Sequence, residues 1–472
     1  MADDSWIKED RRNDFDSSKL TRMKVIITVA IILIGALGTL AFYGLGSNAT
    51  QYQSSGIVLD FGNHKTVWTD IEYSETTDPV EMLDILCNKN EYTYTLDSEG
   101  KLIYVKTKAG DEYPNTAEKS WGLWYAVVDN NTPSYIKSET YDIDVSEYIV
   151  TMWSYTTPDG KPTIALDATN TSIYGYSQPR KLVTLSPVTT EIVSSLNALG
   201  ILVGTDYYSN YPSLVVAGKT NGTIATVGTY SEPSYESIMH TSPDLVVCDG
   251  SQYSHFLMAQ SVRSSDVNSV VIFDGTSLEV ILDNIFIVGT AMHYELRARE
   301  VIDLIRDAVD DLTALAVSSG YSTMVALSTD PAPIVAGSGT YLDEIISSVN
   351  CYNSFADLPG WAHANSEYVI DNNPQTIVIL SGEPVENYDK IIANLPAEWK
   401  MTDAYANGRI YLVTGAAADL SERAGPRIAQ ITELFERMVN PSAFAGEDPI
   451  PYAIGSNYKD YLTITKDLGF GD

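Results

Sequence analysis

The chain has 472 residues, which is enough for two or more domains, and an apolar share of 44% that is ordinary for a protein with a buried core. It carries 29 Lys and Arg residues against 62 Asp and Glu residues, which gives a formal net charge of −33 at pH 7. This acidity argues against nucleic acid as a partner, because phosphate contacts require clustered Lys and Arg side chains.

An apolar segment near the N-terminus predicts a membrane anchor. Residues 25–45 are mostly Val, Ile, Leu, Ala and Gly without a charge, and about 20 such residues cross the hydrocarbon core of a bilayer. Five Lys and Arg residues lie between positions 11 and 24, and positive charge stays on the cytoplasmic side. We therefore expect a cytoplasmic tail over 1–23, a single transmembrane helix over 24–46 and an extracytoplasmic remainder. A cleaved signal peptide is the alternative interpretation.

Residues 57–156 predict a small β-rich α+β domain. Alternation of β-branched or aromatic residues with polar ones is typical of half-buried strands. It occurs over residues 57–61, 66–73, 92–96, 101–106, 121–128 and 147–155. One helix-like segment, DPVEMLDILCNK, begins at Asp78 and interrupts the strands.

Three short motifs in this domain resemble the small C-terminal domain of cobalamin carriers such as transcobalamin. They are Met82-Leu83-Asp84 with Leu86, the stretch WGLWY from Trp121, and the strand from Ile149 to Trp153. Since these residues are mostly core types, a generic β-grasp-like module is the alternative.

The remaining chain predicts an α/β domain after a polar linker over 157–179. Short apolar strands alternate with helices over 180–441, as in a parallel sheet. Apolar residues three or four apart predict one long helix over about 277–317, interrupted only by Gly289. This helix would separate a first lobe, about 180–276, from a second lobe, about 322–441. Residues 442–472 are expected to form a tail.

Several motifs of this region together resemble a known family. They are KLVTLSPVTTEIVSSLNALGILVGTDYYSNYP at 181–212, VGTYSEPSYESIMHTSPDLVV at 227–247, a strand–loop–helix unit at 324–349, and ADLSERAGPRI at 418–428. They resemble substrate-binding proteins of ABC importers for cobalamin and iron siderophores, the helical-backbone class of periplasmic binding proteins. The resemblance implies two Rossmann-like lobes joined by a long backbone helix, with a ligand held between them.

Signals of catalysis or of a metal centre are absent from the sequence. It has no HExxH, GxSxG or complete P-loop motif, and its five histidines are scattered without metal-ligand spacing. The three cysteines, Cys87, Cys248 and Cys351, lack CxxC spacing and are expected to be buried. We therefore expect neither an enzyme nor a resident cofactor, and a bulky ligand rather than a bare ion.

The resemblance also implies a set of ligand-binding residues in the loops at the mouth of the cleft. Tyr208 and Tyr230 fall where cobalamin-binding members place aromatic walls, and a large flat ligand requires such apolar faces. Trp361 lies in the corresponding loop of the second lobe, with His363 close behind. Asp419 and Arg423 are expected to make polar contacts to the ligand, although Glu422 and Arg423 could instead only fix the loop by ion pairing.

Two acidic residues are candidates for docking to the permease. Members of the class carry one acidic residue near the top of each lobe. Glu236 matches the first position. At the second position the chain has Ser347, and Glu344, one turn earlier, is the candidate substitute. The alternative for both is a solvated charge on a helix.

These features predict a membrane-anchored substrate-binding protein that delivers a corrinoid to an ABC permease and its ATPase. A ferric siderophore or haem is the alternative ligand. A cell-surface adhesion or sensor protein that reuses the fold is an alternative of another class.

Overall fold

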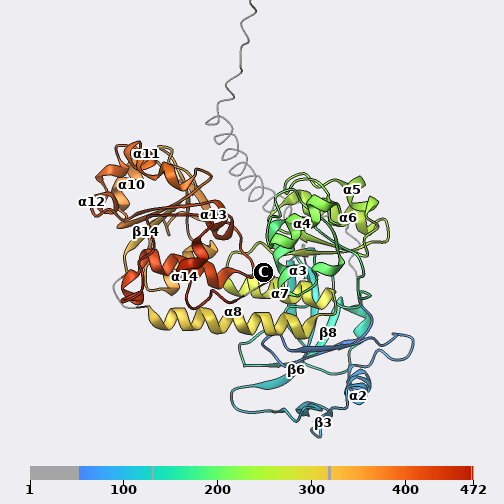
Figure 1. Ribbon diagram of the computed structural model, residues 1–472. Coiled ribbons are helices and arrows are strands. Elements are labelled where there is room, and N and C mark those ends of the chain that lie inside the picture. Colours follow the sequence, from blue (N-terminus) through green and yellow to red (C-terminus); the bar gives the residue numbers. More distant parts are fainter. Residues whose placement is uncertain (1–52, 130–131, 317–319, 469, 471–472) are drawn as a thin grey trace, which may run out of the picture.

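The computed structural model describes residues 53–129, 132–316, 320–468 and 470, and Figure 1 shows their arrangement. The predicted cytoplasmic tail and membrane segment lie outside the described residues. Among the residues that are described, no helix combines the length and the apolar character that a membrane crossing requires.

The small N-terminal domain is built on a five-stranded sheet of order β2-β1-β8-β6-β7. These strands are β1 (Ile57–Asp60), β2 (Thr66–Thr69), β6 (Ser120–Asp129), β7 (Thr132–Lys137) and β8 (Val150–Thr156). A second, three-stranded sheet contains β3 (Thr93–Leu96), β4 (Leu102–Lys106) and β5 (Glu112–Pro114). Helix α2 (Pro79–Lys89) begins as expected at Asp78, whose carboxylate accepts the N–H groups of Val80 and Glu81.

The first lobe has a parallel sheet of order β11-β10-β9-β12-β13. Its strands are β9 (Leu182–Thr184), β10 (Leu202–Thr205), β11 (Ala225–Thr226), β12 (Leu245–Asp249) and β13 (Asn268–Ile272). The connecting helices are α3 (Pro187–Ser195), α4 (Ser213–Asn221), α5 (Tyr235–His240) and α6 (Tyr253–Arg263). Ser186 starts α3 with a capping box shared with Thr189, which fixes the turn after β9.

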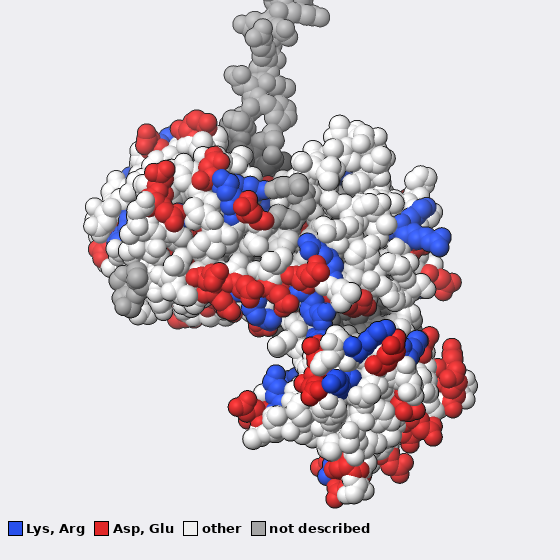
Figure 2. All heavy atoms as spheres, turned by 60° about the horizontal axis from the view of Figure 1, so that its bottom comes forward, with Lys and Arg blue, Asp and Glu red and all other residues white. Residues whose placement is uncertain are grey.

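The second lobe has a mixed sheet of order β17-β15-β14-β18-β19-β20, with β16 paired to β14. Its strands are β14 (Ser322–Ala326), β15 (Ile334–Ala336), β16 (Tyr352–Asn353), β17 (Trp361–His363), β18 (Thr376–Ser381), β19 (Ile410–Thr414) and β20 (Ala453–Ile454). Its helices are α9 (Tyr341–Ser348), α10 (Ser366–Asn372), α11 (Tyr388–Ala393), α12 (Asp403–Ala406), α13 (Gly415–Ser421) and α14 (Ile428–Val439). Figure 1 shows the two lobes side by side and the small domain below the first lobe. Figure 2 shows Asp and Glu side chains scattered over the visible face of the two-lobed region and of the small domain.

The prediction of one long helix over 277–317 is wrong, because two helices occupy this stretch. Helix α7 (Leu278–Ala291) ends at Met292, and the chain turns at His293, whose φ of 62° is left-handed. Helix α8 (Glu295–Leu315) then packs back on α7, and a Cβ on Gly289 would lie 2.4 Å from the Cβ of Ala298. The apolar spacing continues across this corner, so periodicity alone did not reveal it. Helix α8, about 30 Å long, runs beneath both lobes (Figure 1).

Residues 157–179 and 442–472 are more than a polar linker and a tail. The first segment buries Leu166, Ile173 and Tyr176. The second buries Phe444, Ile454, Tyr458, Leu462 and Phe470, and supplies β20 to the sheet of the second lobe. At its end, the carbonyl of Phe470 accepts the hydroxyl of Ser194 in α3. The C-terminal segment therefore packs against both lobes.

Candidate functional site

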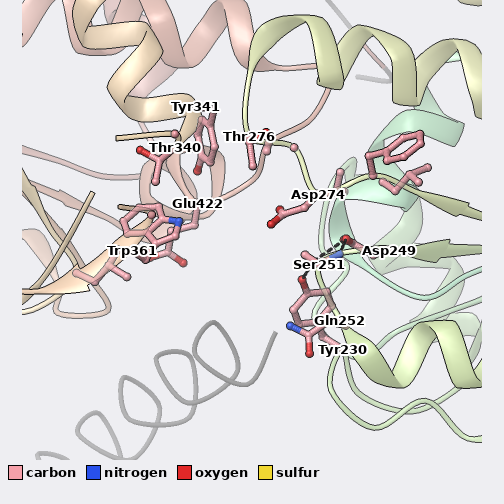
Figure 3. A pocket seen from close by; sticks show the side chains of 18 residues that line it. Tyr230, Asp249, Ser251, Gln252, Asp274, Thr276, Thr340, Tyr341, Trp361 and Glu422 are labelled. Atoms are coloured by element: carbon pink, nitrogen blue, oxygen red, sulfur yellow. Dashed lines mark hydrogen bonds between the residues drawn. The ribbon is translucent and has the colours of Figure 1, made fainter. Parts of the chain in front are cut away.

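A cavity of about 220 Å³ lies between the two lobes (Figure 3). The first lobe contributes residues at the carboxyl ends of β12 and β13, where ligands bind in α/β folds. The second lobe contributes the start of α9, the start of β17 and the loop after α13. In Figure 3, Trp361 and Glu422 face Asp274 and Tyr230 across the open space.

The wall from the first lobe is fixed by a buried histidine. His255 of α6 is fully buried, and its Nδ1 accepts the backbone N–H of Asp249 at 2.9 Å. Its Nε2 lies 2.7 Å from the carbonyl oxygen of Tyr230 and therefore donates to it. Burial lowers the pKa of His255, which keeps the ring neutral in this tautomer. The hydroxyl of Tyr230 is in turn hydrogen-bonded to Ser251, so the phenol ring is held at the edge of the cavity.

The wall from the second lobe is built on the sheet edge and on α9. Trp361 is the first residue of β17 and pairs with Ala336 of β15, which places its indole at the cavity. Thr340 caps α9 by accepting the N–H of Asp343 at 3.2 Å. The hydroxyl of Tyr341 donates to the carbonyl of Ser421 at 2.6 Å, so this ring is fixed to the loop after α13.

Three carboxyl groups line the cavity, and no Lys or Arg side chain is among its described lining residues. Asp249 accepts the N–H and the hydroxyl of Ser251 at 3.0 and 2.6 Å. Desolvation, and then the charge of Asp249, raise the pKa of Asp274 to about 6. Desolvation, and then the charge of Asp419, raise the pKa of Glu422 to about 7, although Arg423 acts in the opposite direction. The cavity is thus acidic and walled by aromatic rings.

The structure brings two of the six predicted ligand-binding residues to the cavity, Tyr230 and Trp361. Tyr208 lies outside it, 42% exposed and in edge contact with the ring of Tyr207.

His363 is exposed on β17, with its Nδ1 3.3 Å from the carbonyl of Ala332. Asp419 does not line the cavity and accepts the side-chain amide of Asn210 at 2.7 Å.

Arg423, the sixth predicted residue, is occupied by a buried ion pair between the lobes. Its Nη1 donates to Oε1 of Glu191 on α3 at 2.8 Å. Arg427 donates to both oxygens of the same carboxylate, at 2.8 and 2.6 Å. Glu191 is 2% exposed, and burial opposes its charge, but the two arginines outweigh that cost and hold its pKa below the usual value. Arg423 therefore joins the lobes here and is not among the residues that line the cavity.

The two predicted docking residues occupy different environments. Glu236 is exposed in the first turn of α5. Glu344 is also exposed, but its Oε2 accepts the backbone N–H of Leu278 at 2.6 Å, at the start of α7. It thus has an intramolecular role at a helix N-terminus, where a negative charge is favourable.

Sequence reasoning missed Asp249, Asp274 and Tyr341, which line the cavity, and His255, which supports its wall, and it considered Glu422 only as an ion-pair partner within its loop. The signal for Asp249 and Asp274 was present in the sequence, because each comes directly after a short apolar run, LVVC and VVIF. Nothing in the sequence distinguished His255 from the other histidines. The three cysteines are free and buried, as expected, and no group of potential metal ligands occurs among the described residues.

Comparisons with known proteins identify relatives of the two-lobed region. A family model described as periplasmic binding protein matches residues 182–417. The chain is 24% identical over 283 residues to an uncharacterized ABC transporter substrate-binding lipoprotein, YvrC, of Bacillus subtilis, covering 59% of this chain and 85% of that protein. It is 22% identical over 298 residues to a cobalamin-binding protein of Halobacterium salinarum, covering 59% and 73%.

Solved structures give matches over the same part of the chain. A possible iron-binding protein of Staphylococcus epidermidis matches at 22% identity and a TM-score of 0.49, covering 56% of this chain and 99% of that one. The vitamin B12 binding protein BtuF of Vibrio cholerae matches at 20% identity and a TM-score of 0.46, covering 57% and 98%.

Proposed function

The chain belongs to the periplasmic binding protein family, and we propose that it captures a corrinoid between its lobes and delivers it to an ABC permease with its ATPase. The name of the Bacillus relative, an ABC transporter substrate-binding lipoprotein, supports the transport role. The name of the Halobacterium relative, a cobalamin-binding protein, supports the ligand class. A binding role without catalysis fits both relatives.

The observation that carries this proposal is the cavity with an aromatic wall from each lobe. Trp361 and Tyr341 line it from the second lobe, and Tyr230 lines it from the first. Rings of this kind offer wide apolar faces with few rotamers to restrict, which suits a large macrocycle. A macrocycle held by both lobes would bury far more surface than one held by a single lobe.

The charge of the cavity favours a corrinoid over haem or an anionic ferric siderophore. Haem carries two carboxylates, and many siderophores carry carboxylate or catecholate groups, which are bound by Arg or Lys. The lining residues include Asp249, Asp274 and Glu422 but no cationic side chain. The periphery of a corrin carries amide groups, whose N–H donors match carboxylate acceptors.

A ligand panel tests the proposed function. The purified full chain is incubated with cyanocobalamin, cobinamide, haemin and a ferric hydroxamate, and free ligand is removed. We expect the ultraviolet–visible spectrum of a corrinoid to remain with the protein at one equivalent. Retention of haem or ferric chelate without corrinoid would instead support the alternative ligand, and retention of none would favour the adhesion or sensor role.

We further propose the arrangement of the whole chain. Residues 24–46 would anchor it in the cell membrane with residues 1–23 in the cytoplasm, and the two-lobed region would lie outside. Protease added to intact cells should then digest the chain beyond Ser47 and spare residues 1–23, and protection of the lobes would contradict this topology.

Reversal of one exposed charge should separate transport from binding. Glu236 makes no ion pair among the described residues and projects from the first turn of α5. If it contacts a permease arginine, Glu236→Arg should leave corrinoid affinity unchanged and reduce uptake by cells at least tenfold, because repulsion replaces attraction. Glu232→Arg, four residues earlier and also exposed, is the matched control. Normal uptake by Glu236→Arg would rule out this docking contact.

A further inference from the structure

We propose that the cavity between the lobes selects positively charged corrinoids that lack the anionic nucleotide tail over neutral corrinoids such as cyanocobalamin. This inference rests on the proposed function and names the ligand class within it.

The carboxyl groups of the cavity come from three separate elements and both lobes. Asp249 ends β12, Asp274 follows β13, and Glu422 follows α13 (Figure 3). A ligand between Trp361 and Tyr230 therefore has acidic groups on more than one side. The cobalt(III) corrin core is cationic, and in cobalamin the phosphodiester of the nucleotide tail cancels one positive charge. Loss of that tail leaves an unopposed charge beside these carboxylates.

The charged and titratable groups next to Asp249, Asp274 and Glu422 do not neutralise these three carboxyl groups. Burial raises the pKa of Tyr230, near Asp249 and Asp274, and that of Tyr341, near Glu422 and Asp274, so both phenols stay neutral. His255 lies near Asp249, but burial lowers the pKa of its imidazole, so it adds no positive charge at pH 8. Asp419 adds further negative potential at Glu422. Arg423 acts on Glu422 from outside the lining, but its guanidinium donates to Glu191 at 2.8 Å and lies 3.7 Å from Asp419. A cationic ligand would therefore supply the positive charge that these carboxyl groups lack within the cavity.

Ligand charge should therefore be linked to proton release. With pKa values near 6 and 7, Asp274 and Glu422 are partly protonated at neutral pH in the free protein. A bound cation favours the ionised forms, so their protons leave on binding. The affinity for a cation should rise as pH increases from about 5 to about 8 and then level off. The affinity for a neutral corrinoid should change much less.

The test uses three corrinoids that separate charge from size. Aquacyanocobinamide carries one positive charge, dicyanocobinamide is its neutral counterpart, and cyanocobalamin is neutral and carries the tail. Dissociation constants are measured for the full chain at low salt, at pH 5 and pH 8. We expect aquacyanocobinamide to bind about tenfold more tightly than either neutral corrinoid at pH 8, and this ratio to shrink at pH 5.

Variants identify the groups responsible. The double variant Asp274→Asn with Glu422→Gln should bring the ratio of the affinities for aquacyanocobinamide and dicyanocobinamide at pH 8 close to one. Asp303→Asn with Asp310→Asn removes the same charge from exposed positions on α8 and should preserve the ratio. Equal affinities at pH 8 for the cationic and neutral cobinamides would overturn the inference and leave the proposed function intact. If no corrinoid binds, the proposed ligand class and this inference both fail.

Discussion

Replacement of Glu191 by Ala should lower the free energy of unfolding by about 3–5 kcal/mol, because it leaves two buried guanidinium groups without their shared counter-ion. Arg423 and Arg427 are 9% and 3% exposed and donate three hydrogen bonds to this one carboxylate. Once this carboxylate is removed, Asp419 at 3.7 Å from Arg423 and the hydroxyl of Tyr458 at 3.2 Å from Arg427 remain, and they offset much less of the desolvation of the two guanidinium groups. Urea denaturation of wild type and variant measures the difference.

An exposed ion pair of the same chain provides the control. Glu279 is 64% exposed and pairs with Arg306 at 3.0 Å. Glu279→Ala should cost less than about 1 kcal/mol, as for exposed pairs in general. The stability that Glu191 contributes also depends on pH, because its pKa is lower in the folded protein than the usual value of 4.5. This contribution is fully present above pH 4.5 and is lost as the pH falls through the lowered folded-state pKa. A loss at Glu191 no larger than the loss at Glu279 would contradict the account of the interlobe ion pair.

Replacement of Glu433 by Ala should cost a similar amount, about 3–5 kcal/mol, and should release the C-terminal segment. This fully buried carboxylate of α14 accepts the backbone N–H groups of Thr463 and Thr465, at 2.7 and 2.8 Å. It also pairs with Arg437 at 2.9 Å. Desolvation opposes its charge, but these donors hold its pKa below the usual value.

Amide hydrogen exchange gives the specific readout for Glu433. In Glu433→Ala, the amides of Thr463 and Thr465 should exchange faster than in the wild type, beyond what the change in global stability produces. Glu433→Gln keeps one acceptor oxygen and should give an intermediate effect. Unchanged protection at both amides would show that the carboxylate does not hold this segment.

The starts of helices in the small domain and in the first lobe follow closely from sequence, because their signals are local. Ser186 and Thr189 form the capping box of α3, and Asp78 with Pro79 starts α2, as such residues do in general. The corner between α7 and α8 did not follow, because apolar spacing continues through it. Gly289 was the visible clue, and its role depends on contact with Ala298. The spacing of apolar residues along the sequence does not indicate such a contact between two helices.

The cavity was only partly predictable. Tyr230 and Trp361 were found through resemblance, and the structure places both at the cavity. Arg423 was expected at the ligand because of its position near the mouth, but Glu191, over 200 positions earlier, occupies it. The acidic lining arises where strands from one lobe meet loops from the other. Such long-range neighbours are set by tertiary packing, which a single sequence does not display.

The most direct test of the central claim compares corrinoid binding by three aromatic variants. The claim is that the ligand lies between the lobes and contacts both. Tyr230→Ala and Trp361→Ala each remove a ring from one wall and should weaken binding by about 1–3 kcal/mol. Tyr208→Ala removes an exposed ring of the first lobe outside the cavity and should leave the affinity unchanged. Unchanged affinity in both wall variants, with folding intact, would contradict the claim, as would a loss confined to Tyr208→Ala.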